Sequence, residues 1–361
     1  MIIKKYFFCI ILIVIAFIAI LFLVFNYKDF EKEEVSTDKI IPQNQWALIN
    51  KGQKVENSFG IKNYDISAKE AWKVTKGDRK VIVGILDTGI DISNPNISDN
   101  IFLNQKEIEK NELDDEKNGF IDDINGWNFI KNDNSVYDRY LSDYHGTFIA
   151  SLIVGKHDLN NNVWGVAPEV NILPLKFIDG STGNTDNAIR AIEYAYKMGV
   201  RIINCSWDNT NFDTGLYDIM KKYKDILFIS SSGNNQNNLK KTPVYPCSFE
   251  LDNVVCVAAV NNTGKIYEYS GYGSEDLIYA PGETILGSLP ENDYLYSSGA
   301  SFATAYVTGV AALVISEFED ISSNDLAQIL KISKKSVTNA NADTYDIIDS
   351  KKALDKAKVM E

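Results

Sequence analysis

The stretch NILPLKFIDGSTGNTDNAIRAIEYAYKMGVRIINCSW (171–207) decides the fold class, because it has the pattern of a strand, a helix and a second strand. Residues 171–177 and 201–207 are short apolar runs typical of buried strands. Residues 185–199 carry apolar side chains at helical spacing and end at Gly199. Strands joined by a helix are usually parallel neighbours in one sheet, so this stretch predicts a parallel sheet covered by helices.

Three further apolar runs extend this pattern along the chain: VIVGIL (81–86), ILFISSS (226–232) and VVCVAAV (254–260). We therefore predict an α/β protein with three α/β/α layers and a mostly parallel central sheet. In this architecture, functional groups gather at the carboxyl ends of the strands.

The N-terminus has the composition of a membrane segment. Lys4 and Lys5 precede an uncharged, mostly apolar stretch from Tyr6 to Tyr27, which matches the ~20 apolar residues that a spanning helix needs. The lysines would stay in the cytoplasm and the acidic far flank outside. We predict a transmembrane signal anchor over residues 1–27, with a cleaved signal peptide as the alternative.

The remaining chain is expected to form a polar tether over residues 28–43 and a single domain over 44–361. The formal net charge of −13 argues against nucleic acid as the main partner, because a phosphate binder needs a basic face. The four cysteines form no CxxC pair, which argues against a zinc site. A disulfide between Cys247 and Cys256 and buried free thiols stay open as alternatives. We expect a monomer.

Three segments place one chemically useful side chain at a strand end or a helix start. Asp87 ends the apolar strand in VGILDTGID, His145 stands in SDYHGTFIASLIVG, and Ser301 opens the apolar helix in SSGASFATAYVTGVAALVIS. Each alone has an ordinary explanation, as a turn residue, a loop histidine or a helix cap. The second histidine, His157, lies in a polar segment and is predicted to be on the surface.

The order Asp, His, Ser with these flanks resembles the subtilisin-like serine proteases, or subtilases. Their patterns are D-[ST]-G, H-G-T-x-[VI]-A and G-T-S-M-A-T-P-x-V-[AT]-G. Other stretches resemble family segments as well, so the likeness runs from about residue 44 to the C-terminus: QWALINKGQ (45–53), GVAPEVNILPLKF (165–177) and DIIDSKKAL (346–354). The resemblance implies a serine endopeptidase whose catalytic triad is Asp87, His145 and Ser301, with no cofactor required for the chemistry.

The resemblance also implies an oxyanion donor and a substrate cleft. SSGNN (231–235) is similar to the family's A-A-G-N, which makes Asn234 the donor to the oxyanion. A substrate peptide would lie extended along CSWD (205–208) and SSSG (230–233). The substrate-binding residues implied are Ser206, Trp207, Asp208, Ser231, Ser232 and Gly233.

The chain departs from the family pattern near the site. Ala300 replaces the usual Thr, which predicts a lower rate, and Ala305 replaces the usual Pro, which should be harmless. Asp208 stands at a position where Gly is usual and predicts either a narrower cleft or a preference for basic substrate residues. Residues 28–43 are too few for the family's usual pro-domain, so we expect folding that is unaided or helped in trans.

An acidic segment, NELDDEKNGFIDDINGWNF (111–129), partly resembles an EF-hand loop. Its spacing makes Asp114, Glu116, Asn118 and Asp122 candidate ligands of a structural calcium ion. The alternative is a solvated acidic turn.

Together these features predict an endopeptidase that is tethered to the cell membrane and acts on peptides or proteins outside the cell, or a secreted one if the N-terminal segment is cleaved. A sharper form of this prediction is a processing protease for a secreted peptide. The competing class is a catalytically impaired relative that binds peptides. A non-proteolytic α/β hydrolase is excluded by the lack of a G-x-S-x-G elbow and by the order of the three residues.

Overall fold

The computed structural model describes residues 42, 44–158, 162–339 and 341–360. The predicted membrane segment over residues 1–27 and the tether, apart from Pro42, lie outside the described residues. Among those that are described, one helix is long and apolar enough to cross a bilayer, α6 (Ala300–Glu317). Because 89% of that helix is buried inside the domain, we assign it to the protein core.

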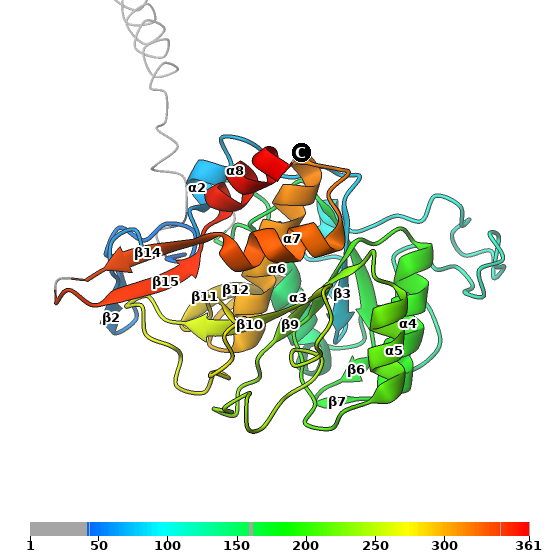
Figure 1. Ribbon diagram of the computed structural model, residues 1–361. Helices are drawn as coiled ribbons and strands as arrows, with labels where there is room; N and C mark the ends of the chain where they lie inside the picture. Colours follow the sequence, from blue (N-terminus) through cyan, green and yellow to red (C-terminus); the bar gives the residue numbers. More distant parts are fainter. Residues whose placement is uncertain (1–41, 43, 159–161, 340, 361) are drawn as a thin grey trace, which may run out of the picture. The chain divides into compact units, whose positions relative to one another are not determined.

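A seven-stranded sheet forms the centre of the domain, in the order β11-β10-β9-β8-β3-β5-β4. Every neighbouring pair in it is parallel, which confirms the predicted sheet (Figure 1). Its strands are β3 (Ile82–Asp87), β4 (Trp127–Asn128), β5 (Asn171–Lys176), β8 (Ile202–Cys205), β9 (Leu227–Ser231), β10 (Val254–Val260) and β11 (Ile278–Pro281). All seven residues of β10 are buried, as expected for a strand covered on both faces.

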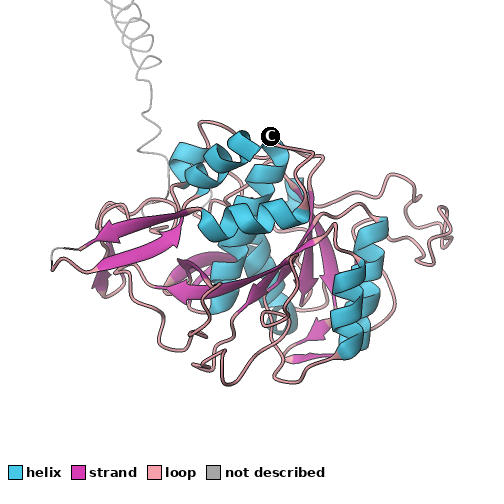
Figure 2. Ribbon diagram, viewed as in Figure 1, coloured by secondary structure: helices cyan, strands magenta, loops and turns pink. Residues whose placement is uncertain are grey.

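Two pairs of helices cover the sheet (Figures 1 and 2). Helix α3 (Tyr140–Val154) packs against α6 on one face. On the other face lie α4 (Thr185–Lys197) and α5 (Thr214–Lys222), side by side. Their first turns are capped by the side chains of Asn184 and Asp213, which accept hydrogen bonds from backbone N–H groups of 2.7 and 2.9 Å.

Smaller elements surround these layers. The helices are α2 (Ala68–Ala71), α7 (Ser323–Ile332), α8 (Ser350–Met360) and the short 3₁₀ turns Ser98–Asn100 and Pro290–Asn292. Four antiparallel pairs complete the described chain: β1 (Lys54–Val55) with β2 (Ser58–Phe59), β6 (Ile178–Asp179) with β7 (Thr182–Gly183), β12 (Ile285–Leu289) with β13 (Asp293–Ser297), and β14 (Lys334–Thr338) with β15 (Thr344–Ile348).

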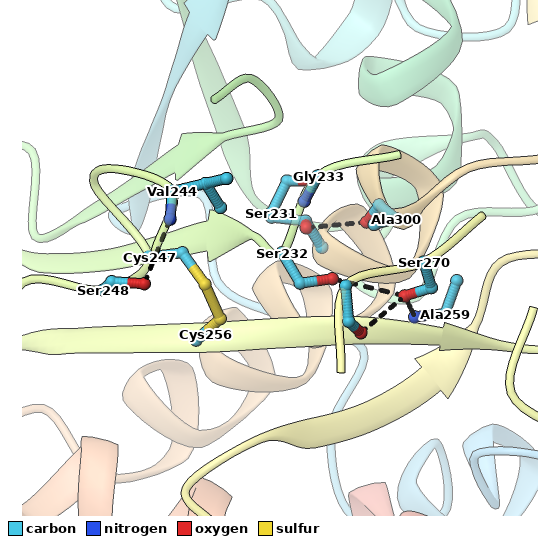
Figure 3. The surroundings of a disulfide bond; sticks show 12 residues. Ser231, Ser232, Gly233, Val244, Cys247, Ser248, Cys256, Ala259, Ser270 and Ala300 are labelled. Carbon is cyan, nitrogen blue, oxygen red and sulfur yellow. Dashed lines mark hydrogen bonds between the residues drawn. A yellow bond between two sulfur atoms is a disulfide. The ribbon is translucent and has the colours of Figure 1, made fainter. Parts of the chain in front are cut away.

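A disulfide joins Cys247 to Cys256, with Cα atoms 4.7 Å apart (Figure 3). This separation lies inside the usual range for a disulfide and selects one of the two alternatives left open by the sequence. Cys256 is the register partner of Ser230 on β9, so the bond lies one strand away from Ser231 and the segment after it. Cys205 is a buried free thiol.

Candidate active site

Asp87 and His145 form a hydrogen-bonded pair at the carboxyl edge of the sheet. Asp87 is the last residue of β3 and is 1% exposed. Its Oδ1 accepts a 2.7 Å hydrogen bond from His145 Nδ1 and another of 2.7 Å from the Thr88 N–H. Burial lowers the pKa of His145, but the charge of Asp87 and its hydrogen bond outweigh burial and raise it above the usual 6.5.

The residues after Asp87 and His145 explain why a short motif surrounds each. A Cβ on Gly146 would lie 2.5 Å from the carbonyl oxygen of Gly89, so only glycine fits this approach. The Gly146 N–H donates to Thr88 Oγ1 at 2.8 Å, and the Asp91 N–H donates to Thr147 Oγ1 at 2.9 Å. These contacts fix the middle of α3 against the loop that follows β3.

Ser301 lies in the first turn of α6 and is 6% exposed. Its hydroxyl donates a 2.9 Å hydrogen bond to the carbonyl of Ser206, whose own hydroxyl donates to the Ser301 carbonyl at 2.9 Å. The ring of the next residue, Phe302, lies 6.1 Å from the His145 ring, which places the start of α6 beside the histidine. Donation to His145 therefore requires the Ser301 hydroxyl to leave the Ser206 carbonyl.

Asn234 lies next to the start of the same helix. Its Oδ1 accepts a 2.8 Å hydrogen bond from the Ala300 N–H. Because a backbone N–H can only donate, this bond identifies the oxygen of the amide and leaves the Nδ2 group as a donor. The Asn234 side chain is exposed, so Nδ2 is available to a ligand.

The six predicted substrate-binding residues lie on two neighbouring segments. The first segment, residues 206–208, follows β8, and the second, residues 231–233, begins with the last residue of β9. Strands β8 and β9 are neighbours in the sheet, with Cys205 opposite Ser230. Within the described part of the chain, the backbones of Trp207 and Asp208 make no hydrogen bond. Two adjacent strand ends with free backbone groups are suited to binding an extended peptide.

A buried ion pair that the sequence reasoning missed supports this edge. Lys176 Nζ contacts Asp143 Oδ1, and the two side chains are 1% and 0% exposed. Lys176 is the register partner of Asp87 on β5, and Asp143 lies two residues before His145. Asp143 also accepts a 3.1 Å hydrogen bond from the Gly89 N–H. The signal in the sequence was the lysine inside the apolar run NILPLKF.

The surface position predicted for His157 is wrong. Its ring lies 4.4 Å from each of the Trp72 and Trp164 rings, and its Nε2 contacts the Gly165 carbonyl at 2.8 Å. Burial lowers the pKa of His157 to about 4. The local polar sequence concealed this packing because Trp72 comes from a distant segment.

The acidic segment brings together a different set of residues from the predicted one. The Asp114 carboxylate accepts from the Asn118 and Gly119 N–H groups at 3.0 and 2.8 Å, so it stabilises a turn. Asp122 accepts backbone hydrogen bonds of 3.2 and 3.0 Å in the same manner. Glu116 does lie in a cluster, and Asn118 Nδ2 contacts it at 2.7 Å.

That cluster consists of Glu107, Glu116 and Asp123, whose nearest carboxylate oxygens all lie within 4.8 Å of one another. Glu107 is 7% exposed, and its Oε2 is buried without a hydrogen-bond partner among the described residues. Burial raises the pKa of Asp123 to about 6. The sequence pattern did not indicate this cluster, because Glu107 lies before the segment with the EF-hand-like spacing.

Comparisons with known proteins agree with this fold. The model of the Subtilase family (peptidase S8) matches residues 78–349. Subtilisin-like protease 2 of Plasmodium falciparum is 32% identical over 249 residues, which are 66% of this chain and 17% of that protein. Thermitase of Thermoactinomyces vulgaris is 27% identical over 255 residues, covering 70% of this chain and 80% of thermitase.

Solved structures give the same result. The prenylagaramide maturation protease PagA has a TM-score of 0.62 and 25% identity, covering 81% of this chain and 98% of PagA. A cold adapted subtilisin-like serine proteinase shares the fold, with a TM-score of 0.62 and 22% identity over 85% of this chain and 99% of that one. The fold and site thus define a protein of the subtilisin-like class. The chain belongs to the Subtilase family.

Proposed function

We propose that the protein is a serine endopeptidase that uses Asp87, His145 and Ser301 as a catalytic triad. The observation that carries this proposal is the 2.7 Å bond between Asp87 Oδ1 and His145 Nδ1 beside the helix that begins at Ala300. The Ser301 hydroxyl attacks the scissile carbonyl while His145 takes its proton, and His145 later returns that proton to the leaving amine. Asp87 orients the imidazole and stabilises its charged form.

The oxyanion that forms in this step needs donors that are already in place. Asn234 Nδ2 and the Ser301 N–H are the proposed pair, because Ala300 fixes the orientation of the amide and α6 points its N-terminus at the same place. Ala300 has no hydroxyl near the oxyanion, so the rate should be lower than with the usual Thr.

The substrate is proposed to be a peptide segment in extended conformation. The free backbone groups of Trp207 and Asp208, next to the end of β9, would pair with it as an added strand. No cofactor is required for this chemistry.

We further propose that the enzyme acts outside the cell, tethered through residues 1–27 or released from them, as a monomer that processes a secreted peptide. The apolar N-terminal stretch supports the tether. The Cys247–Cys256 disulfide supports an oxidising compartment. PagA, which shares the fold, is itself described as a maturation protease.

Labelling with a fluorophosphonate tests the proposed activity. The full-length chain should be labelled, and the Ser301→Ala variant should not. Absence of labelling in a folded, unmutated protein would contradict the triad and favour the alternative of an impaired relative that binds peptides.

We also propose a structural calcium ion at Glu107, Glu116 and Asp123. The buried, unpartnered Oε2 of Glu107 fits an ion that prefers oxygen ligands, although Lys106 already pairs with Glu116 at 3.0 Å. The ion would join the loop at residues 104–123 and take no part in catalysis. Asp114 and Asp122 are left out, because backbone N–H groups already occupy them.

Thermal unfolding tests the calcium site. A ligand at 100 times its Kd stabilises by about 2.7 kcal/mol, so calcium at that excess should raise the Tm of a domain of this size by roughly 4 °C. Glu107→Gln should remove this shift, whereas Glu109→Gln, a nearby exposed residue, should keep it. Equal melting with calcium and with chelator would contradict the site.

A further inference from the structure

The carboxylate of Asp208 lies against Gly233, the residue before the proposed oxyanion donor. A Cβ built on Gly233 would be 3.2 Å from Asp208 Cγ, 3.2 Å from Oδ2 and 3.3 Å from Oδ1. Both carboxylate oxygens therefore face the point where residues 206–208 and 231–233 approach each other. Gly233 has φ of +81°, a left-handed conformation that side chains rarely adopt, so this approach depends on glycine.

The carboxylate of Asp208 has no partner in the part of the chain that the structure describes. Among the described residues, no hydrogen bond or ion pair satisfies its carboxylate. Its side chain is only partly exposed, and burial alone raises the pKa of Asp208. A partly buried carboxylate without a partner is costly, and a cation brought by a ligand would remove that cost.

The surrounding residues hold Asp208 in place. Asn209 and Tyr245 exchange two backbone hydrogen bonds, of 2.8 Å from the Asn209 N–H and 2.7 Å from the Tyr245 N–H. On the other side, Trp207 packs edge-on against Phe177 with ring centroids 5.0 Å apart. The backbone on both sides of Asp208 is thus anchored, which limits where its carboxylate can lie.

The geometry of the proposed reaction indicates which substrate residue would lie next to Asp208. In the proposed reaction, the scissile carbonyl must contact both Ser301 and Asn234. The substrate residue that supplies this carbonyl carries its side chain on the adjacent Cα, so the side chain must lie close to the same two residues. Gly233 is adjacent to Asn234 in the chain, and Ser206 is hydrogen-bonded to Ser301. The substrate side chain therefore enters between these two segments, where Asp208 lies.

We propose that the protein cleaves after a basic residue, with Asp208 as the counter-ion of its side chain and arginine preferred to lysine. Because both oxygens of Asp208 are without partners, a guanidinium group can bind them with two parallel hydrogen bonds. This inference rests on the proposed peptidase function and specifies its substrate.

Cleavage of matched peptides tests the inference. The peptides differ only in the residue before the cut, which is arginine, lysine, methionine or glutamine. Arginine should exceed methionine in kcat/KM by about 30-fold or more, as expected for a paired buried charge. Asp208→Asn should bring the arginine and methionine peptides within about 3-fold of each other in kcat/KM, whereas Asp252→Asn, which removes an exposed carboxylate of equal charge, should keep the preference for arginine.

Binding without catalysis separates this inference from the proposed activity. The Ser301→Ala variant should bind a product peptide ending in arginine at least about 10-fold more tightly than one ending in methionine. If the probe labels Ser301 but neither assay distinguishes the peptides, the role of Asp208 is wrong and the peptidase stands. If labelling fails but binding still favours arginine, the peptidase is wrong and the basic-residue pocket stands. A faster Asp208→Gly variant with no preference would identify Asp208 as an obstruction instead.

Discussion

The backbone N–H of Ala300 donates a 2.8 Å hydrogen bond to the side-chain oxygen of Asn234. This bond joins the segment after β9 to the first turn of α6, and it sets which end of the amide faces a substrate. The donor is therefore oriented before any peptide binds, which is the condition under which an oxyanion site is effective.

Replacing this donor should slow turnover without weakening the fold. Asn234→Asp keeps an oxygen for the Ala300 N–H but has no N–H₂ group. We expect kcat to fall by about 10²–10³, the range established for one oxyanion donor, including that of subtilisin, with little change in KM. Steady-state kinetics and a thermal melt check this. An unchanged kcat in the aspartate variant would contradict the assignment of Asn234.

The pH profile should report the pairing of His145 with Asp87. Only the neutral imidazole accepts the Ser301 proton, and Asp87 raises the pKa of His145. The acid limb of kcat/KM should therefore lie above pH 6.5, with activity lost as the pH falls through it. In Asp87→Asn, only burial would act on the pKa of His145 and would lower it. The acid limb should therefore move to lower pH, while kcat falls by about 10⁴. A limb that does not move would contradict the pairing.

The buried ion pair between Lys176 and Asp143 should contribute more to the free energy of unfolding than an exposed ion pair does. Lys176→Met leaves the Asp143 carboxylate buried without a cation, which typically costs about 3–5 kcal/mol. Adding Asp143→Asn should restore part of this loss, because it removes the uncompensated charge. Lys73→Met, at the exposed pair with Glu70, should change stability far less. Urea unfolding of these three variants and of Asp143→Asn alone measures these differences, and additive losses in the double variant would contradict coupling.

Acid should destabilise the protein through His157. Its pKa is about 4 in the folded chain and about 6.5 in the unfolded one, so the unfolded state binds more protons between these values. The stabilisation is fully present above pH 6.5 and is lost as the pH falls toward 4, by up to about 3 kcal/mol. Denaturant unfolding at several pH values should show this slope, and His157→Phe should flatten it. An equal slope in the variant would exclude His157 as the cause.

The sequence predicted the parallel sheet well, because strands buried on both faces are continuous apolar runs such as VVCVAAV. It also placed Asp87 and His145, whose pairing depends on strand ends that meet at one edge of the sheet. The sheet prediction is confirmed because it rests on local pattern, and the general topology of parallel sheets explains why Asp87 and His145 lie together.

Contacts between distant segments were harder to predict. The ring of His157 stacks on Trp164 and meets Trp72 edge-on, and no local pattern connects Trp72 with the other two residues. The acidic cluster differs from the predicted ligand set for a related reason. Counting along an EF-hand spacing selected Asp114, whose carboxylate accepts hydrogen bonds from backbone N–H groups, whereas the fold brings Glu107 beside Glu116. Side-chain partners are set by tertiary structure, and a one-dimensional spacing does not contain them.

The proposed nucleophile belongs to a helix that is also the centre of the domain. In α6, all residues from Ala300 to Ile315 are buried, and the helix packs against α3, β8, β9 and β10. Loss of the surrounding layers would therefore release Ser301 from Ser206 and from the neighbourhood of His145 together. Active-site titration should then count folded molecules, and a population losing its tertiary structure would lose probe reactivity in the same proportion.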